Sequence, residues 1–253
     1  MNVVVDGLMT NYQKLGSGSK TLLMLHGWGD TAKTYSKLIE ELQQDCLILA
    51  VDMPGFGGTQ PPESAWGLED YADFINHWLK KINVSKIDAI VGHSYGGSIA
   101  IVGLASGTLS ASNLVLIASA GIRNKNTARK KVLKAAARVG KLPLYLLPQH
   151  KRRAIKAKFY SSIGSDVALL PHMELTFKRM IGHDVRGEAA KVKIPTLIIY
   201  GSKDKDTPVG DGHILNRSIT GSQLEILDSG HFIHQEKSQE VARLIKNFLK
   251  AKR

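Results

Sequence analysis

The sequence predicts an α/β fold built on a doubly wound, mostly parallel sheet, with a helical segment inserted late in the chain. Three observations support this prediction. Short and almost continuously apolar runs alternate with longer segments of helical periodicity. Each run ends in glycine, aspartate, histidine or serine, as is typical of strands buried on both faces of a parallel sheet. One interval of about 75 residues then contains no strand-like run.

The predicted elements follow one another in a regular order. The first residues, 2–7 and 9–16, are expected to form an antiparallel hairpin at the edge of the sheet. Six apolar runs are predicted to be parallel strands, namely 21–27, 46–52, 87–93, 113–119, 195–201 and 223–229. Helices are predicted at 31–43, 68–82, 95–106 and 236–250. The last has apolar residues at helical spacing, namely Val241, Leu244, Ile245, Phe248 and Leu249.

The insertion lies between the sixth and seventh predicted strands and differs from the rest in charge. Residues 122–193 hold 18 lysines and arginines against 4 aspartates and glutamates, whereas the remainder holds 16 against 18. The net charge of +12 therefore arises from this segment. The predicted domains are a core of residues 1–121 and 194–253 and a basic helical cap of residues 122–193. An apolar stripe marks its first helix, namely Ala128, Val132, Ala135, Ala136 and Val139.

The composition excludes several classes of protein. With Cys46 as its single cysteine, the chain can form neither an intrachain disulfide nor a cysteine-based metal site. The N-terminus lacks the basic and apolar regions of a signal peptide, and no apolar stretch approaches the ~20 residues of a membrane-spanning helix. A cytoplasmic protein is therefore expected.

Reactive residue types follow five of the predicted strands. Parallel sheets bind ligands at the carboxyl ends of their strands. The segments there are HGWGD (26–30), DMPGFGGT (52–59), GHSYGG (92–97), GSKDKDTP (201–208) and SGHF (229–232). A serine, two acidic residues and a histidine are therefore expected along one edge, in the order Ser, Asp, His.

The segment around Ser94 fits the pattern G-x-S-x-G of a nucleophile elbow. In this motif the serine occupies a sharp, strained turn between a strand and a helix. Bulky side chains two residues before or after the serine are expected to collide with it, which explains Gly92 and Gly96. The following helix would direct its first backbone N–H groups toward developing negative charge.

With five such segments in this order, the chain resembles the α/β-hydrolase superfamily of serine hydrolases. The resemblance covers nearly the whole sequence apart from the detailed content of the cap. It implies that Ser94 is the nucleophile, that His231 is the general base and then acid, and that Asp204 orients the imidazole. It also implies an oxyanion hole made by the backbone N–H groups of Trp28 and Tyr95.

Two of these assignments have rivals in the sequence. Asp206 stands two residues after Asp204, and His234 three after His231. His26, His93 and Asp52 are expected to brace loops rather than to react. No cofactor and no metal are predicted, because the other histidines show no ligand-like pairing, namely His77, His150, His172, His183 and His213.

The resemblance implies cleavage of carboxylic esters through an acyl-enzyme on Ser94. The alternatives are a carbon–carbon bond hydrolase of ring-cleavage products, a lipid monoester hydrolase, a proline iminopeptidase and a non-catalytic ligand-binding member of the fold. Serine at the elbow disfavours dehalogenases and epoxide hydrolases, whose elbow carries aspartate. The scarcity of acidic residues in 122–193 disfavours recognition of a substrate amine.

The expected partner is a small-molecule ester or acyl substrate. Candidate pocket residues are Leu144, Phe159, Met173 and Phe177. The basic cap is first of all a solvated surface, and the alternatives are weak association with anionic lipid surfaces or steering of anionic substrates. Nucleic acid is not expected, because no recognised module surrounds the charges. No feature of the sequence specifies an oligomeric state.

Overall fold

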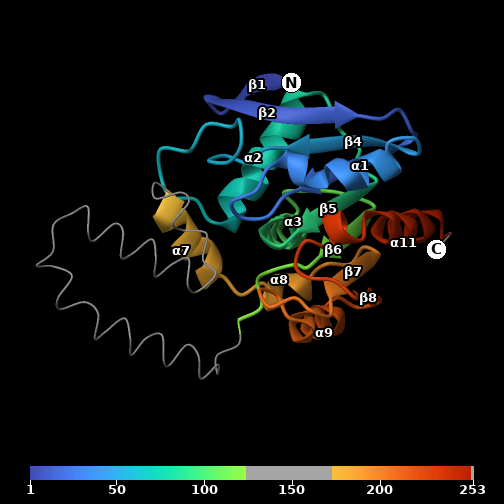
Figure 1. Cartoon of the computed structure of the whole chain (residues 1–253). Coiled ribbons are helices and arrows are strands. Elements are labelled where there is room, and N and C mark those ends of the chain that lie inside the picture. Colours follow the sequence, from blue (N-terminus) through green and yellow to red (C-terminus); the bar gives the residue numbers. More distant parts are fainter. Residues whose placement is uncertain (124–172, 252–253) are drawn as a thin grey trace, which may run out of the picture. The chain divides into compact units, whose positions relative to one another are not determined.

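The computed structural model of the protein describes residues 1–123 and 173–251. Its sheet has eight strands in the order β1-β2-β4-β3-β5-β6-β7-β8 (Figure 1). The first two form an antiparallel hairpin that pairs antiparallel with β4, and all other pairs are parallel. The predicted sheet is confirmed, with strands β1 (Asn2–Val5), β2 (Leu8–Leu15), β3 (Lys20–Leu25), β4 (Cys46–Val51), β5 (Ala89–His93), β6 (Asn113–Ile117), β7 (Thr196–Gly201) and β8 (Gln223–Leu227).

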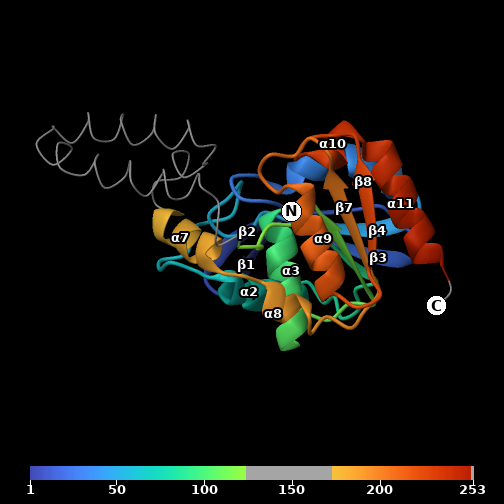
Figure 2. The same cartoon turned by 90° about the horizontal axis from the view of Figure 1, so that it is seen from below.

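Helices cover both faces of this sheet (Figure 2). One face carries α1 (Ser36–Leu42), α10 (Ile233–Glu236) and α11 (Ser238–Lys250), which contact one another. The other carries α2 (Leu68–Lys81), α3 (Tyr95–Ser106), α8 (Arg186–Ala189) and α9 (Val209–Ser218), which form a contacting row. A short 3-10 helix, η1 (Ala32–Tyr35), leads into α1, and α7 (Glu174–Gly182) precedes α8.

The central strands are buried because both faces of the sheet are covered. In β3, Leu22 and Met24 belong to the core packed under α1 and α11. The alternate residues Leu23 and Leu25 are equally buried on the opposite face. This two-sided burial explains why the strand reads as a continuous apolar run. None of the helices in the described part of the chain is long and apolar enough to span a membrane.

The chain divides into two compact units, one of Met1–Ile122 with Leu175–Arg253 and one of Arg123–Glu174. The predicted cap, 122–193, is longer than the second unit, because α8 packs with α3 and α9 in the first. Val185 and Ala189 are fully buried there, so this stretch is part of the core. The apolar stripe predicted within 128–139 lies outside the described residues.

Candidate active site

Ser94 occupies the sharp turn between β5 and α3. Its backbone has φ of 51° and ψ of −116°, a left-handed conformation that is unusual for a residue with a side chain. Its N–H donates to the carbonyl of Ile117 over 3.0 Å, and its own carbonyl accepts from the N–H of Ala120 over 3.0 Å. The turn is therefore fastened to the end of the neighbouring strand β6, and these bonds hold the strained conformation.

The glycines beside Ser94 are required by close backbone contacts. A Cβ atom on Gly92 would lie 2.6 Å from the carbonyl oxygen of Gly96, and one on Gly96 would overlap the carbonyl of Leu25 in β3. The collisions are thus with the first turn of α3 and with the adjacent strand. From the sequence, the glycines are expected to avoid Ser94 itself; the nearest atoms are instead backbone atoms of Gly96, Gly97 and Leu25.

Asp204 and His231 form a direct pair at the carboxyl ends of β7 and β8. His231 Nδ1 lies 2.7 Å from Asp204 Oδ2, and the aspartate side chain is fully buried. Burial alone would raise the pKa of Asp204. The hydrogen bond and charge of His231, together with hydrogen bonds from Thr207, outweigh it and hold the pKa of this carboxyl below its usual value. The buried carboxylate therefore stays ionised and faces the imidazole.

Neither rival takes part in this hydrogen bond. Asp206 is exposed, and its backbone N–H donates to Asp204 Oδ1 over 2.8 Å. His234 is fully buried, with its Nε2 2.8 Å from Thr34 Oγ1. Burial, followed by the charge of His231, lowers the pKa of His234 to about 3, so this ring is neutral. Of the two candidate pairs, the geometry brings together Asp204 and His231.

Thr207 belongs to the same cluster and was missed from the sequence. Its hydroxyl donates to Asp204 Oδ2 over 2.7 Å and lies 3.2 Å from His231 Nδ1, and its N–H donates to Asp204 Oδ1 over 3.0 Å. Asp204 therefore accepts N–H groups two and three residues ahead, as aspartates in turns commonly do. The available signal was an aspartate followed by Lys-Asp-Thr-Pro just before a helix.

The elbow and the loop of His231 are in contact. His93 Nε2 donates to the backbone carbonyl of His231 over 3.1 Å, and the two ring centroids are 4.8 Å apart. Among the described residues, Ser94 Oγ and His231 Nε2 form no direct hydrogen bond. Because Nδ1 faces the aspartate, Nε2 is the nitrogen on the open side of the ring. In enzymes without bound substrate, hydrogen bonds between catalytic groups are often long and tighten on binding.

The segment HGWGD runs beside Ser94. A Cβ atom on Gly27 would lie 3.2 Å from the Cβ of Ser94, so the backbone leading to Trp28 passes directly next to the elbow. His26 holds this segment in place, since its Nδ1–H donates to the carbonyl of Gly27 over 2.8 Å and its Nε2 accepts from Met53 N–H over 2.9 Å. Asp52 adds a second brace by accepting the N–H groups of Ala32 (2.7 Å) and Gly58 (2.9 Å).

An aromatic cluster adjoins the elbow. The ring of Trp28 lies 4.9 Å from that of Phe56, 4.9 Å from that of Phe177 and 6.3 Å from that of Tyr95. Phe177, on α7, is a predicted pocket residue that the structure places beside both predicted oxyanion residues. Met173 belongs to the smaller unit, and Leu144 and Phe159 lie outside the described residues.

Within residues 1–123 and 173–251, side chains of the types that bind metal ions lie close together in two groups. One is Asp204, Asp206 and His231, and the other is Asp30, His93 and His234, each with ligand atoms within 4.8 Å of one another. In the first group the closest contact is the Asp204–His231 hydrogen bond. This arrangement suits proton transfer between a carboxylate-oriented imidazole and a nearby hydroxyl.

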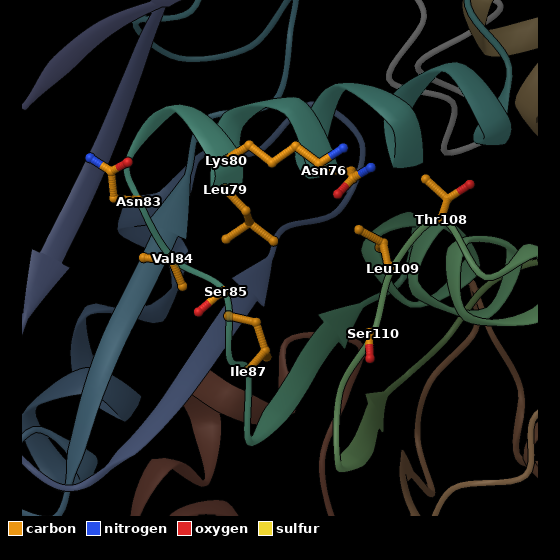
Figure 3. A pocket seen from close by; sticks show the side chains of 10 residues that line it. All are labelled: Asn76, Leu79, Lys80, Asn83, Val84, Ser85, Ile87, Thr108, Leu109 and Ser110. Carbon is orange, nitrogen blue, oxygen red and sulfur yellow. The ribbon is translucent and has the colours of Figure 1, made fainter.

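A cavity of about 550 Å³ lies at the opposite edge of the sheet (Figure 3). Its walls are the end of α2 and the loops before β5 and β6, and they include Lys80, Asn83, Ser85 and Thr108. These loops enter the amino ends of the strands, whereas Ser94, Asp204 and His231 follow the carboxyl ends. The cavity is therefore separate from the candidate active site.

Comparison of the sequence with models of known protein families identifies the family of this chain. The model of the alpha/beta hydrolase family matches residues 22–244. The chain belongs to the alpha/beta hydrolase family. All five segments that follow the strands lie within the matched range. The predicted membership, made from these segments, is confirmed.

Individual relatives of this hydrolase agree with the family match. Monoacylglycerol lipase ABHD6 of Bos taurus is 27% identical over 90% of this chain and 75% of its own length. An uncharacterized Mycobacterium bovis protein, Mb2734, is 26% identical over 97% and 79%. The family and the likeness to the monoacylglycerol lipase support hydrolase activity.

Solved structures share the fold. The esterase EaEST of Exiguobacterium antarcticum superposes with a TM-score of 0.76 at 21% identity, over 98% of this chain and 97% of that one. A meta-cleavage product hydrolase, CumD of Pseudomonas fluorescens IP01, gives a TM-score of 0.74 at 20% identity, over 98% and 96%.

Proposed function

We propose that this protein is a serine hydrolase that cleaves carboxylic esters through an acyl-enzyme on Ser94. The observation that carries the proposal is the arrangement at the carboxyl edge of the sheet. There, Ser94 occupies a strained turn just before α3, and its neighbour His93 donates to the backbone carbonyl of His231. The imidazole of His231 is in turn paired with the buried carboxylate of Asp204. The likeness to a monoacylglycerol lipase supports an ester as the substrate.

In the proposed reaction, Ser94 Oγ attacks the ester carbonyl and its proton passes to His231 Nε2. Asp204 stabilises the resulting imidazolium. The N–H groups of Trp28 and Tyr95 hold the oxyanion. The imidazolium then returns the proton to the leaving alcohol, and an acyl-enzyme remains. Water, deprotonated by the same imidazole, attacks this acyl group, and the imidazolium then returns that proton to Ser94 Oγ as the acid is released.

The aromatic cluster favours an apolar acyl group. The rings of Trp28, Phe56, Tyr95 and Phe177 form one cluster, and two of these residues are the proposed oxyanion-hole residues. These groups offer dispersion contacts and no charge to a bound acyl chain. We therefore place esters with apolar acyl groups, lipid monoesters among them, ahead of charged substrates.

Weak association with anionic lipid surfaces is a further part of this proposal. It depends on the sequence alone, through the excess of basic residues in 122–193. Co-sedimentation with anionic vesicles at low and high salt measures it. We expect binding at low salt that high salt abolishes, and absence of binding at low salt would contradict it.

A fluorophosphonate probe tests the nucleophile. We expect the probe to label wild-type protein and not to label Ser94→Ala. The control is Ser110→Ala, at an exposed serine, which should be labelled like wild type. Turnover of p-nitrophenyl esters should fall by roughly 10³-fold or more in Ser94→Ala. Folded wild-type protein that takes up no probe would favour a non-catalytic binder.

The same ester series distinguishes the reaction class. Acyl lengths from C2 to C12 are compared with a dienoate product of ring cleavage. We expect ester hydrolysis to dominate. Rapid turnover of the dienoate with negligible ester hydrolysis would make carbon–carbon cleavage the function.

A further inference from the structure

Three buried polar atoms behind the elbow have no hydrogen-bond partner among the described residues. They are Asp30 Oδ2, His93 Nδ1 and His234 Nδ1. His93 is 1% exposed and His234 is fully buried, and ligand-type atoms of the three side chains lie within 4.8 Å of one another. Buried polar atoms in folded proteins are nearly always paired with protein or with an ordered water, so this cluster requires an occupant.

The partners of His93 determine which of its nitrogens carries the hydrogen. Its Nε2 lies 3.1 Å from the carbonyl of His231, which can only accept, so Nε2 is the donor. Burial, followed by the neighbouring histidines His234 and His231, holds the pKa of His93 well below the usual value, and the ring is neutral. A neutral imidazole has one N–H. The Nδ1 of His93 is therefore a hydrogen-bond acceptor.

His234 has the opposite arrangement. Its Nε2 lies 2.8 Å from Thr34 Oγ1, and that oxygen already accepts from Gln235 Nε2 over 2.7 Å. The Thr34 hydroxyl hydrogen has no other acceptor within the described part of the chain, so it is donated to His234 Nε2. The single N–H of this neutral ring is then on Nδ1, which is a donor.

Asp30 supplies the third atom. Its Oδ1 accepts from the N–H of Thr31 over 2.8 Å, and its buried Oδ2 is a second acceptor. The cluster thus contains one donor and two acceptors. A water molecule accepts from one group and donates to two, which satisfies all three atoms. A metal ion needs a lone pair from each, and His234 presents an N–H instead.

We propose that a single water molecule is bound here, accepting from His234 Nδ1 and donating to His93 Nδ1 and Asp30 Oδ2. Two partners of a tetrahedral water, each at about 2.8 Å, are about 4.6 Å apart, which is within the 4.8 Å upper limit on the separation of ligand-type atoms of the three side chains.

This water joins three loops of the candidate active site. Asp30 ends the HGWGD segment, His93 precedes Ser94, and His234 follows His231 by three residues. His93 also donates to the carbonyl of His231. We infer that Asp30, His93 and His234 are positioning residues that hold the three loops in register. This second step rests on the proposed function, whereas the binding site for water does not.

Two variants of His234 separate the bridge from the rest of the side chain. An asparagine places its amide near the position of Nδ1 and can still donate to the water. A glutamine places its amide near Nε2, keeps the contact with Thr34 and leaves the water without its donor. His213→Gln, at an exposed histidine of α9, controls for the substitution itself.

High-resolution crystal structures with anomalous data test the site. We expect a peak about 2.8 Å from the three atoms, without anomalous signal, in wild type and His234→Asn but not in His234→Gln. A peak at about 2.1 Å with anomalous signal, direct contact of the rings with Asp30, or an unchanged peak in His234→Gln would overturn the proposal. If a variant does not fold, the peak in the wild-type electron-density map still tests the water site through its distances and its anomalous signal.

Kinetics test the positioning role. We expect kcat for p-nitrophenyl butyrate to fall about tenfold in His234→Gln with unchanged KM, and to recover in His234→Asn. Equal kcat in the two variants would refute positioning through the water. If wild-type protein hydrolyses no ester while the peak is present, the proposed function fails and the water site stands.

Discussion

Thr207 Oγ1 lies 2.7 Å from Asp204 Oδ2, on the loop that brings this carboxylate to His231. The same hydroxyl is 3.1 Å from the carbonyl of Ala118, at the end of β6. The single hydrogen of this hydroxyl is donated to Asp204 at the shorter distance, so the threonine lies between the acidic residue and the neighbouring strand. This contact orients the carboxylate and contributes to its lowered pKa.

Thr207→Val tests this contact. Valine keeps the shape and removes the hydroxyl, so we expect kcat for a p-nitrophenyl ester to fall about tenfold with little change in KM, because the carboxylate loses one of its orienting bonds. Thr207→Ser keeps the hydroxyl and should recover most of the rate. Equal rates for the valine and serine variants would show that the hydroxyl does not contribute.

Replacing Ser94 with glycine should stabilise the protein while removing its activity. A left-handed residue with a Cβ atom costs on the order of 1–3 kcal/mol, and glycine adopts φ of 51° without this cost. We expect Ser94→Gly to raise the free energy of unfolding in urea by about 1 kcal/mol and Ser94→Ala to leave it nearly unchanged. Ser110→Gly, in an exposed loop, measures the general cost of glycine. A loss of stability in Ser94→Gly as large as that in Ser110→Gly would argue against strain.

Buried neutral histidines should destabilise the fold in mild acid. Burial and nearby histidines lower the pKa of His234 to about 3 and that of His93 well below the ordinary value of 6.5. As pH falls below 6.5, the unfolded chain therefore binds protons that the folded chain does not. Each such group removes up to about 1.4 kcal/mol of unfolding free energy per pH unit, until its folded pKa is reached.

Urea unfolding between pH 7 and pH 4.5 measures this effect. We expect a steady loss of stability across the interval, with a smaller slope in His234→Asn because one titrating group is gone. The lowered pKa of Asp204 acts only below its ordinary value of 3.8, outside this interval. A flat profile in wild type would contradict the neutral state of these rings.

Phe177→Ala should alter selectivity for the acyl chain. Its ring lies 4.9 Å from that of Trp28 and 6.4 Å from that of Tyr95, so its removal takes apolar surface from the proposed acyl site. We expect kcat/KM to fall about tenfold for longer acyl chains and much less for acetate esters. Leu175→Ala, at a residue that is 65% exposed on the same helix, should leave the series unchanged. A uniform loss across all chain lengths would point to a folding defect instead.

The strands were predicted well because two-sided burial leaves a clear trace in the sequence. Leu22 to Leu25 are all apolar, since alternate residues face different layers of helices. The helix predicted at 236–250 was less accurate. It corresponds to α11, which begins two residues later at Ser238, and the separate short helix α10 before it was not predicted; Lys237, with φ of −131°, separates the two helices, which the apolar spacing does not reveal.

The order of Ser94, Asp204 and His231 along the chain and the glycines of the elbow are properties of the sequence, because a parallel sheet brings the ends of successive strands to one edge. Contacts between distant segments were decided only by the tertiary structure.

Thr207 contacts His231, which is 24 residues away in the sequence, and His93 contacts the carbonyl of His231, which is 138 residues away. The pairing of Asp204 rather than Asp206 with the imidazole likewise depends on how the turn after β7 directs each carboxylate. Strand and turn patterns are local and readable in sequence, whereas the direction of a side chain is set by the packing of every loop around it.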